Sequence, residues 1–312
     1  MKRVGIIGSG NVGANTAFFI AENRTASVTL VDAKAGLSTG KALDLMEAGP
    51  IRGYSSRVTG ADELAAIRGH DIVVLAAGRV RRPGENRIDL YLDNSKIVAA
   101  LCAQIRELAP HAVVINVVEP VDSLTLLAQE ALGFHRFKTL GVGGNLDGTR
   151  LRYLVSQAAG VSPREVSGLV IGPHRHSMLA VKDTIRISGV PAAFFLGEER
   201  LNGLIEEMRG AGDAILEMAQ HSTSYWAPSA ATARLVHAVA ADTRTVMSVS
   251  VRLEGEYGVS GLAISVPAVI GADGVHRILD VGLSNSEQTA FLAATAELRK
   301  AVAQEQSRLK AR

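Results

Sequence analysis

A glycine-rich segment near the start of the chain has the spacing of a dinucleotide-binding turn. It reads Gly8-Ser9-Gly10-Asn11-Val12-Gly13 and stands between a strand-like segment and a helix-like segment. In this motif the first glycine permits a tight turn, the second lets the backbone approach a pyrophosphate, and the third lets the helix pack against the sheet. N–H groups at the start of the helix attract the phosphates. We therefore expect the cofactor to contact Gly8, Gly10, Asn11, Val12 and Gly13.

An acidic residue follows this motif at the distance expected for a ribose contact. Asp32 comes 19 residues after Gly13 and directly follows the predicted strand Val28–Val31. A carboxylate there accepts hydrogen bonds from the adenosine ribose hydroxyls and repels a 2′-phosphate, which favours NAD over NADP. Lys34 is close enough to weaken that preference. The alternative is a glycine-rich turn that binds no ligand. The strand, the helix and the acidic residue all occur at the positions that the motif requires, which favours nucleotide binding.

Two other groups of charged residues, considered by themselves, are typical of a solvent-exposed surface and do not indicate a functional site. Asp147 and Arg150 are three residues apart on one predicted helical face, and such pairs are most often surface ion pairs. Four arginines that lie close together are compatible with a solvated basic loop: Arg79, Arg81, Arg82 and Arg87.

Short apolar segments alternate with helical patterns through the first 140 or so residues. We predict strands at Val4–Ile7, Val28–Val31, Asp71–Ala76, Ala112–Val117 and Thr139–Val142, and helices at Val12–Ala21, Leu37–Met46, Leu90–Leu108 and Ser123–Leu132. Strands rich in β-branched residues that alternate with helices predict an α/β fold, with a doubly wound parallel Rossmann sheet covered on both faces.

The pattern changes after Gly143-Gly144 and predicts a second, α+β domain. We predict helices at Asp147–Ala159, Glu198–Gln220, Ala230–Asp242 and from about Ser286 onward, and strands at Val166–Ile171, Met178–Val181, Thr184–Ile187, Thr245–Val251 and Gly261–Val266. The expected division is an NAD-binding Rossmann domain at 1–143 and a substrate or catalytic domain at 144–312.

The overall composition excludes several classes of function. The 312 residues include 33 basic and 31 acidic residues, so no broad attraction to nucleic acid or to an anionic membrane is expected. No apolar run approaches the roughly 18 residues that cross a bilayer. Cys102 is the only cysteine and lies in an apolar stretch, where we interpret it as core packing. A single cysteine cannot form an internal disulfide, which predicts a reducing, cytoplasmic location.

A series of further segments spans almost the whole chain in a recognisable order: Gly5–Gly13, Leu30–Asp32, Gly40–Leu45, Ala77-Gly78, Arg82–Gly84, Arg87, Asn94, Pro120–Asp122, Leu146-Asp147, Arg150, Gly172, His174, Tyr225–Pro228 and Leu253–Val259. In this series the chain resembles the lactate/malate dehydrogenase family, and most closely the malate dehydrogenases that share the lactate dehydrogenase fold. The resemblance implies hydride transfer between NAD and a small 2-hydroxy acid, and a homodimer or homotetramer. No metal site is predicted.

The resemblance also implies roles for individual residues. His174 is placed as the catalytic acid and base, and Asp147 as the carboxylate that orients it. Arg150 is placed as the residue that binds the substrate carboxylate in a two-pronged pair. The loop Arg79–Arg87 resembles the family's lid, in which Arg87 polarises the substrate carbonyl. Asn94 is placed at the cofactor.

Substrate choice in the family depends on the position that Arg81 occupies here. The malate enzymes carry arginine there, where it pairs with the second carboxylate of oxaloacetate, and the lactate enzymes usually carry glutamine. By that rule we expect a dicarboxylate substrate, with malate and oxaloacetate as the leading pair.

Three departures from the family pattern fall in the predicted active site. The family's Gly-Glu-His-Gly-Asp-Ser is replaced by Gly172-Pro173-His174-Arg175-His176-Ser177. Glu119 replaces an asparagine that donates a hydrogen bond to the substrate oxygen, and Ser222 replaces a glycine. An ionised glutamate has no proton to donate, and losing one such donor typically costs about 10²-fold or more in rate.

Three explanations of these departures stay open. Glu119, placed in the substrate site, pairs with Arg175 so that the two changes compensate. Alternatively, the pocket accepts another 2-oxo acid, such as an unusually acidic one, with Glu119 receiving an ammonium or hydroxyl group. In the third explanation the protein binds NAD but has lost turnover. The retained residues argue against simple decay: His174, Asp147, Arg150, Arg81 and Arg87.

Overall fold

The computed structural model describes residues 1–81, 84–219 and 223–311. Its first half forms six parallel strands: β1 (Arg3–Ile7), β2 (Ser27–Val31), β3 (Val58–Ala61), β4 (Ile72–Leu75), β5 (Val113–Asn116) and β6 (Thr139–Gly141). They lie in the order β3-β2-β1-β4-β5-β6, which is the order of a doubly wound dinucleotide-binding sheet. The predicted α/β fold class is therefore confirmed.

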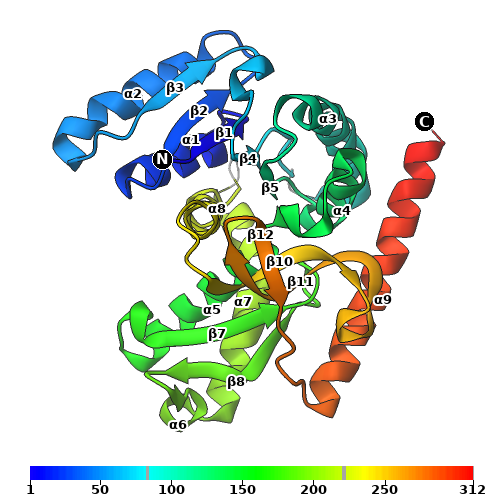
Figure 1. Ribbon diagram of the computed structural model, residues 1–312. Coiled ribbons are helices and arrows are strands. Elements are labelled where there is room, and N and C mark those ends of the chain that lie inside the picture. Colours follow the sequence, from blue (N-terminus) through cyan, green and yellow to red (C-terminus); the bar gives the residue numbers. More distant parts are fainter. Residues whose placement is uncertain (82–83, 220–222, 312) are drawn as a thin grey trace.

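Four helices cover the two faces of this parallel sheet. They are α1 (Asn11–Glu22), α2 (Leu37–Arg52), α3 (Arg87–Leu108) and α4 (Val121–Leu132). Helices α1 and α2 lie on one face and α3 and α4 on the other (Figure 1). Every residue of β4 and of β5 is buried, as expected for central strands of a sheet that is covered on both sides.

The second half of the chain extends this sheet and adds a smaller one. Strands β10 (Thr245–Glu254), β11 (Ser260–Gly271) and β12 (Gly274–Ile278) continue the sheet beyond β6 in antiparallel pairing. The smaller sheet contains β7 (Val166–Ile171), β8 (Leu179–Ile187) and β9 (Val190–Pro191). The larger sheet contains strands from both sides of residue 143. The division into 1–143 and 144–312 therefore stays a proposal.

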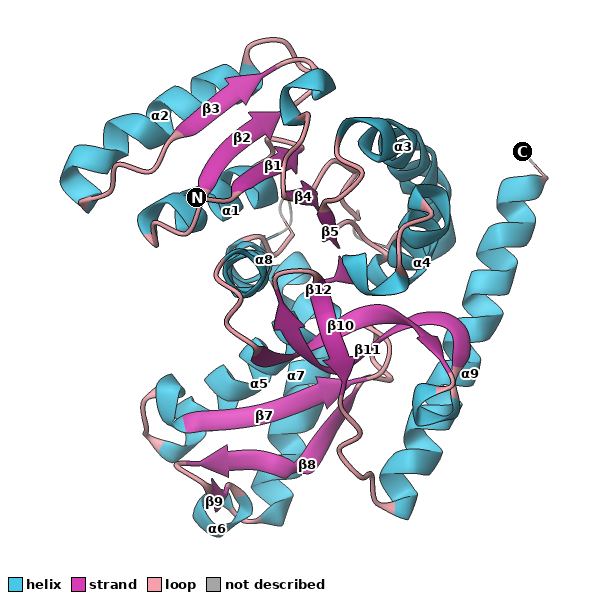
Figure 2. Ribbon diagram, viewed as in Figure 1, coloured by secondary structure: helices cyan, strands magenta, loops and turns pink. Residues whose placement is uncertain are grey.

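The helices of the second half pack around both sheets (Figure 2). They are α5 (Gly143–Ala159), α6 (Ala193–Leu196), α7 (Glu198–Ala219), α8 (Trp226–Ala240) and α9 (Asn285–Lys310). Short 3₁₀ helices occur at Leu64–Ile67, Arg136–Lys138, Pro163–Glu165 and Glu256–Gly258. A capping box of Ser284 and Glu287 begins α9. None of the helices in the described part of the chain is both long and apolar enough to cross a membrane.

Several elements differ from the sequence-based prediction. Strands β3, β9 and β12 and the short helix α6 were not predicted. The two strands predicted at Met178–Val181 and Thr184–Ile187 form the single strand β8, in which the polar residues Lys182 and Asp183 face solvent. Helix α2 runs past the predicted end at Met46, through Pro50, and ends before Gly53, whose φ of 73° is left-handed.

Some predictions lie on residues that the structure does not describe. These are Arg82 and Pro83 of the lid motif, Ser222, and the end of the helix predicted to reach Gln220.

Candidate active site

A cavity of about 200 Å³ lies at the carboxyl ends of the central parallel strands. Its walls come from the segments that follow β4 and β5, from the starts of α1, α3 and α5, and from α7. The carboxyl edge of a doubly wound sheet is where such folds bind their ligands. Five of the predicted site residues that bear charge or can titrate line the cavity: Arg81, Arg87, Glu119, Arg150 and His174.

The glycines of the nucleotide motif occupy positions where a side chain does not fit or is not needed. Gly8 has a φ of +102°, and a Cβ there would lie 2.5 Å from the backbone nitrogen of Ala77. A Cβ at Gly13 would lie 1.8 Å from the carbonyl oxygen of Gly8. Gly10 faces open space and precedes α1, whose first turn has no side-chain cap. The N–H groups of this turn can therefore receive a pyrophosphate.

Asp32 lies beside this turn at the end of β2. Its carboxylate accepts hydrogen bonds from the backbone N–H of Ser9 at 2.8 Å and of Lys34 at 3.0 Å. These bonds hold the carboxylate next to the glycine motif, and the geometry is compatible with the predicted ribose contact.

We expect Asp32→Ser to reduce the preference for NADH over NADPH by about tenfold or more, because a charge-assisted hydrogen bond is lost and a 2′-phosphate is no longer repelled. Fluorescence titration with both nucleotides measures the two affinities. Asp44→Ser, at an exposed position of α2, is the matched control. An unchanged preference in Asp32→Ser would contradict the assignment.

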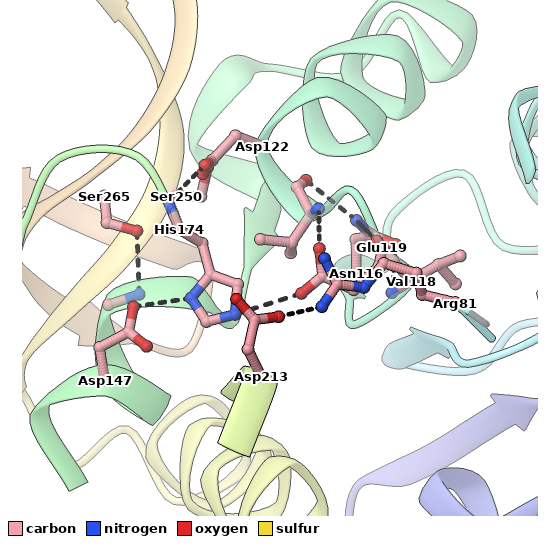
Figure 3. A network of polar contacts seen from close by, with 12 residues as sticks. Arg81, Asn116, Val118, Glu119, Asp122, Asp147, His174, Asp213, Ser250 and Ser265 are labelled. Atoms are coloured by element: carbon pink, nitrogen blue, oxygen red, sulfur yellow. Dashed lines mark hydrogen bonds and ion pairs between the residues drawn. The ribbon is translucent and has the colours of Figure 1, made fainter. Parts of the chain in front are cut away.

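His174 is held in place by two acidic residues. Gly172, with a φ of 91°, pairs with Ser265 of β11 and turns the chain after β7. The backbone N–H of His174 then donates to Asp122 Oδ2 at 2.7 Å, and its Nδ1 lies 2.7 Å from Oδ2 of the buried Asp147 (Figure 3). Asp147 is thus positioned to fix the orientation of the imidazole and to stabilise its positive charge.

Glu119 lies on the opposite side of the imidazole ring (Figure 3). Its Oε1 is 3.1 Å from Nε2 of His174, and its Oε2 accepts from the backbone N–H of Val121 at 3.1 Å. Burial opposes ionisation of Glu119, but the charge and the hydrogen bond of His174, together with Arg87, lower the pKa of Glu119 to about 2.

The protonated form of His174 is stabilised by its two acidic neighbours. Burial opposes the charge, but Asp147 and Glu119 together raise the pKa of His174 well above its usual value. The imidazolium therefore donates to a carboxylate from each ring nitrogen.

Two further arginines supply positive charge to the cavity. Arg150 on α5 has an Nη1 atom 3.4 Å from Asp147 Oδ1, and its Nε is buried with no hydrogen-bond partner in the described part of the chain. Arg87, at the start of α3, forms no ion pair with the residues that the structure describes, and its charge acts on Glu119. Both side chains line the cavity, where their positive charge favours an anionic substrate.

Arg81 has a partner that the sequence did not predict. Its guanidinium contacts the carboxylate of Asp213 on α7, and Asp213 Oδ2 is also 2.8 Å from Nε2 of His176. The sequence offered no signal for Asp213, because a single acid within a long helix usually faces solvent. Asp122 lies in the matching segment Pro120–Asp122, but the sequence did not predict its contact with the backbone of His174.

The structure does not contain the Glu119–Arg175 pair that was considered from sequence. Glu119 lies against His174, whereas the guanidinium of Arg175 faces Glu305 of α9 at 3.6 Å. The two substitutions therefore do not compensate through direct contact, and the charge of Arg175 is directed toward a buried carboxylate.

Asn94 connects two of the loops that form the cavity. Its side-chain amide donates to the carbonyl oxygens of Glu119 at 2.7 Å and Arg79 at 3.0 Å, and it accepts from the backbone N–H of Arg79 at 2.7 Å. Asn94 is fully buried. We propose that it serves the cofactor site by holding these loops. Among the described residues, no cluster of three or more histidine, cysteine or acidic side chains could hold a metal ion.

Comparisons with known proteins agree with this geometry. Residues 2–141 match the model of the lactate/malate dehydrogenase NAD-binding domain, and residues 144–308 match the alpha/beta C-terminal domain of the same family. A malate dehydrogenase of Methanosarcina mazei is 36% identical over 302 residues, which cover 97% of this chain and 98% of that protein.

Solved structures show the same likeness. The malate dehydrogenase of Cryptosporidium parvum has a TM-score of 0.95 at 29% identity, and the match covers 98% of this chain and 99% of that one. The lactate dehydrogenase of the same organism, in complex with lactic acid and NAD, has a TM-score of 0.92 at 30% identity over 99% of this chain and 98% of that one.

Proposed function

This chain belongs to the lactate/malate dehydrogenase family of NAD-dependent hydroxy-acid dehydrogenases, and we propose that it interconverts malate and oxaloacetate. The observation that carries the proposal is the His174–Asp147 pair, 2.7 Å apart at a cavity that Arg81, Arg87 and Arg150 also line. Three arginines suit an anion with two carboxylates.

In the proposed mechanism, Arg150 binds the C1 carboxylate of the substrate and Arg81 binds the second one. Arg87 stabilises negative charge that develops on the C2 oxygen. His174 gives a proton to that oxygen during reduction and removes it during oxidation, while Asp147 keeps the ring oriented. The glycine motif and Asp32 would hold NAD, which would supply the hydride acceptor for oxidation or the donor for reduction.

A panel of 2-oxo acids tests this substrate assignment. NADH oxidation is followed at neutral pH with oxaloacetate, pyruvate, and bulkier or more acidic 2-oxo acids, alongside NADH binding by fluorescence. We expect oxaloacetate to give the highest kcat/KM. Tight NADH binding without oxaloacetate turnover would contradict the proposal.

Glu119 favours a second candidate, a dehydrogenase of the same fold that acts on another 2-oxo acid. Its carboxylate lies beside the reacting position, 3.1 Å from His174 Nε2, where it can accept a hydrogen bond from a substrate hydroxyl or ammonium group. Fast turnover elsewhere in the panel supports this candidate. Absence of turnover throughout the panel, with NADH bound, supports a silent NAD-binding protein.

Arg81→Gln tests the distal contact. We expect the ratio of kcat/KM for oxaloacetate to that for pyruvate to fall by about 10- to 100-fold, because a charge-assisted pair with the second carboxylate is lost. Arg200→Gln, at an exposed position of α7, is the matched control. If the ratio of the two kcat/KM values does not change in Arg81→Gln, a residue other than Arg81 binds the second carboxylate.

We further propose a cytoplasmic location, because the chain has a single cysteine and can form no internal disulfide. A place in the tricarboxylic acid cycle and a homodimer or homotetramer are proposed from the family resemblance. We retain the two-domain division at residue 143. The lactic acid and oxamate named for the related lactate dehydrogenases support a small-molecule partner here.

A further inference from the structure

Asp213 pairs with the guanidinium group of Arg81, which under the proposed function binds the second carboxylate of the substrate. Asp213 follows Gly212 on α7, and its carboxylate contacts Arg81 from across the cavity (Figure 3). Both side chains line the cavity. The pocket therefore contains a carboxylate of the protein itself on Arg81.

This carboxylate is ionised and shared by two basic groups. Burial opposes its charge, but hydrogen bonds from Arg81 and His176 lower the pKa of Asp213. His176 Nε2 lies 2.8 Å from Asp213 Oδ2, so the histidine and the arginine contact different oxygens of the same group. The charge of Arg81 is thereby neutralised within the protein.

The Arg81–Asp213 pair is accessible enough to exchange. The side chains are 25% and 46% exposed, and ion pairs that water reaches contribute little net stability. A substrate carboxylate can therefore displace Asp213 from Arg81. Asp213 is part of α7 in the same chain, so it competes for Arg81 intramolecularly, at a high effective concentration.

We propose that Asp213 is a specificity-determining residue that competes with the second carboxylate of the substrate for Arg81. The inference rests on the proposed function, because it takes a dicarboxylate as the ligand. Asp213 weakens dicarboxylate binding and leaves monocarboxylates almost unaffected, since the latter have no group to place at Arg81. The enzyme thus discriminates less between the two classes than Arg81 alone would permit.

Binding to the enzyme–NADH complex tests this inference without turnover. L-malate and L-lactate are already reduced, so neither reacts with NADH, and each is titrated against the fluorescence of bound NADH. We expect Asp213→Asn to bind malate about tenfold more tightly than the original protein, because Arg81 is released from a charged partner. Lactate affinity should change less than about twofold. Asp213→Ala should behave in the same way.

Glu207→Gln is the matched control, because it removes a carboxylate from an exposed position of the same helix. It should leave both affinities unchanged. Unchanged malate binding in Asp213→Asn would overturn the inference. Weaker malate binding would also overturn it, and would assign Asp213 to orienting Arg81 for the substrate.

The two proposals fail in distinguishable ways. If the original protein does not turn over oxaloacetate, the proposed function fails. The malate titration still measures whether Asp213 restricts access to Arg81.

Discussion

Replacing His174 by asparagine is expected to lower kcat for oxaloacetate reduction by about 10²- to 10⁴-fold, the usual contribution of a general acid. The asparagine side chain is similar in size to the part of the imidazole that contains Nδ1, the atom that faces Asp147. Its amide cannot gain or lose a proton near neutral pH. Because His174 Nδ1 is only 2.7 Å from a buried carboxylate, the substitution also removes the positive charge that Asp147 stabilises. Steady-state kinetics with saturating NADH measures the loss.

The affinity for NADH should be nearly unchanged in this variant, because His174 is not part of the glycine motif. His237→Asn, on the exposed side of α8, serves as the control and should retain full activity. Near-normal kcat in His174→Asn would show that the substrate proton comes from another group.

Glu119→Asn is expected to raise kcat/KM for oxaloacetate by about 10²-fold. An asparagine side chain can donate a hydrogen bond to the developing oxyanion, which an ionised glutamate cannot do. The change also frees His174 Nε2 from the carboxylate that lies 3.1 Å away. Glu130→Gln, on the exposed side of α4, is the control and should change nothing.

The same variant should shift the pH profile. Burial lowers the pKa of His174, but Asp147 and Glu119 raise it well above its usual value, and Glu119→Asn removes one of these two carboxylates. Reduction needs protonated His174, so its rate falls as the pH rises through that pKa. The alkaline limb of kcat/KM should therefore move to lower pH.

A decrease in oxaloacetate turnover in Glu119→Asn would contradict this account. It would show that the carboxylate helps the natural substrate, and it would favour the candidate in which another 2-oxo acid donates a hydrogen bond to Glu119. Comparing the variant with the original protein across the 2-oxo acid panel separates these two cases.

The sequence predicted the features that depend on local patterns. The central strands and the helices that follow them were found because apolar residues recur with the periods of strands and helices. The glycine motif was found because its turn requires glycine at fixed positions, as the φ of +102° at Gly8 illustrates. Strand β3 was missed because it is short and contains a glycine, and tertiary pairing with β2 stabilises it.

The parts of the site that were missed depend on contacts between distant segments. Asp213 and Arg81 are 132 residues apart, and no local pattern links them. Arg175 was considered as a partner of Glu119 because both depart from the family pattern. Its actual neighbour, Glu305, is on the last helix, and only the packing of α9 brings the two together.

The most direct test of the central claim is the transfer of deuterium from NADH to the substrate. NADH with deuterium at both C4 positions of the nicotinamide is incubated with oxaloacetate and the purified protein, and the product is analysed by mass spectrometry. We expect malate with deuterium at C2, formed at an initial rate about 10²- to 10⁴-fold lower by His174→Asn. Unlabelled malate, or no malate while NADH remains bound, would contradict the proposed function.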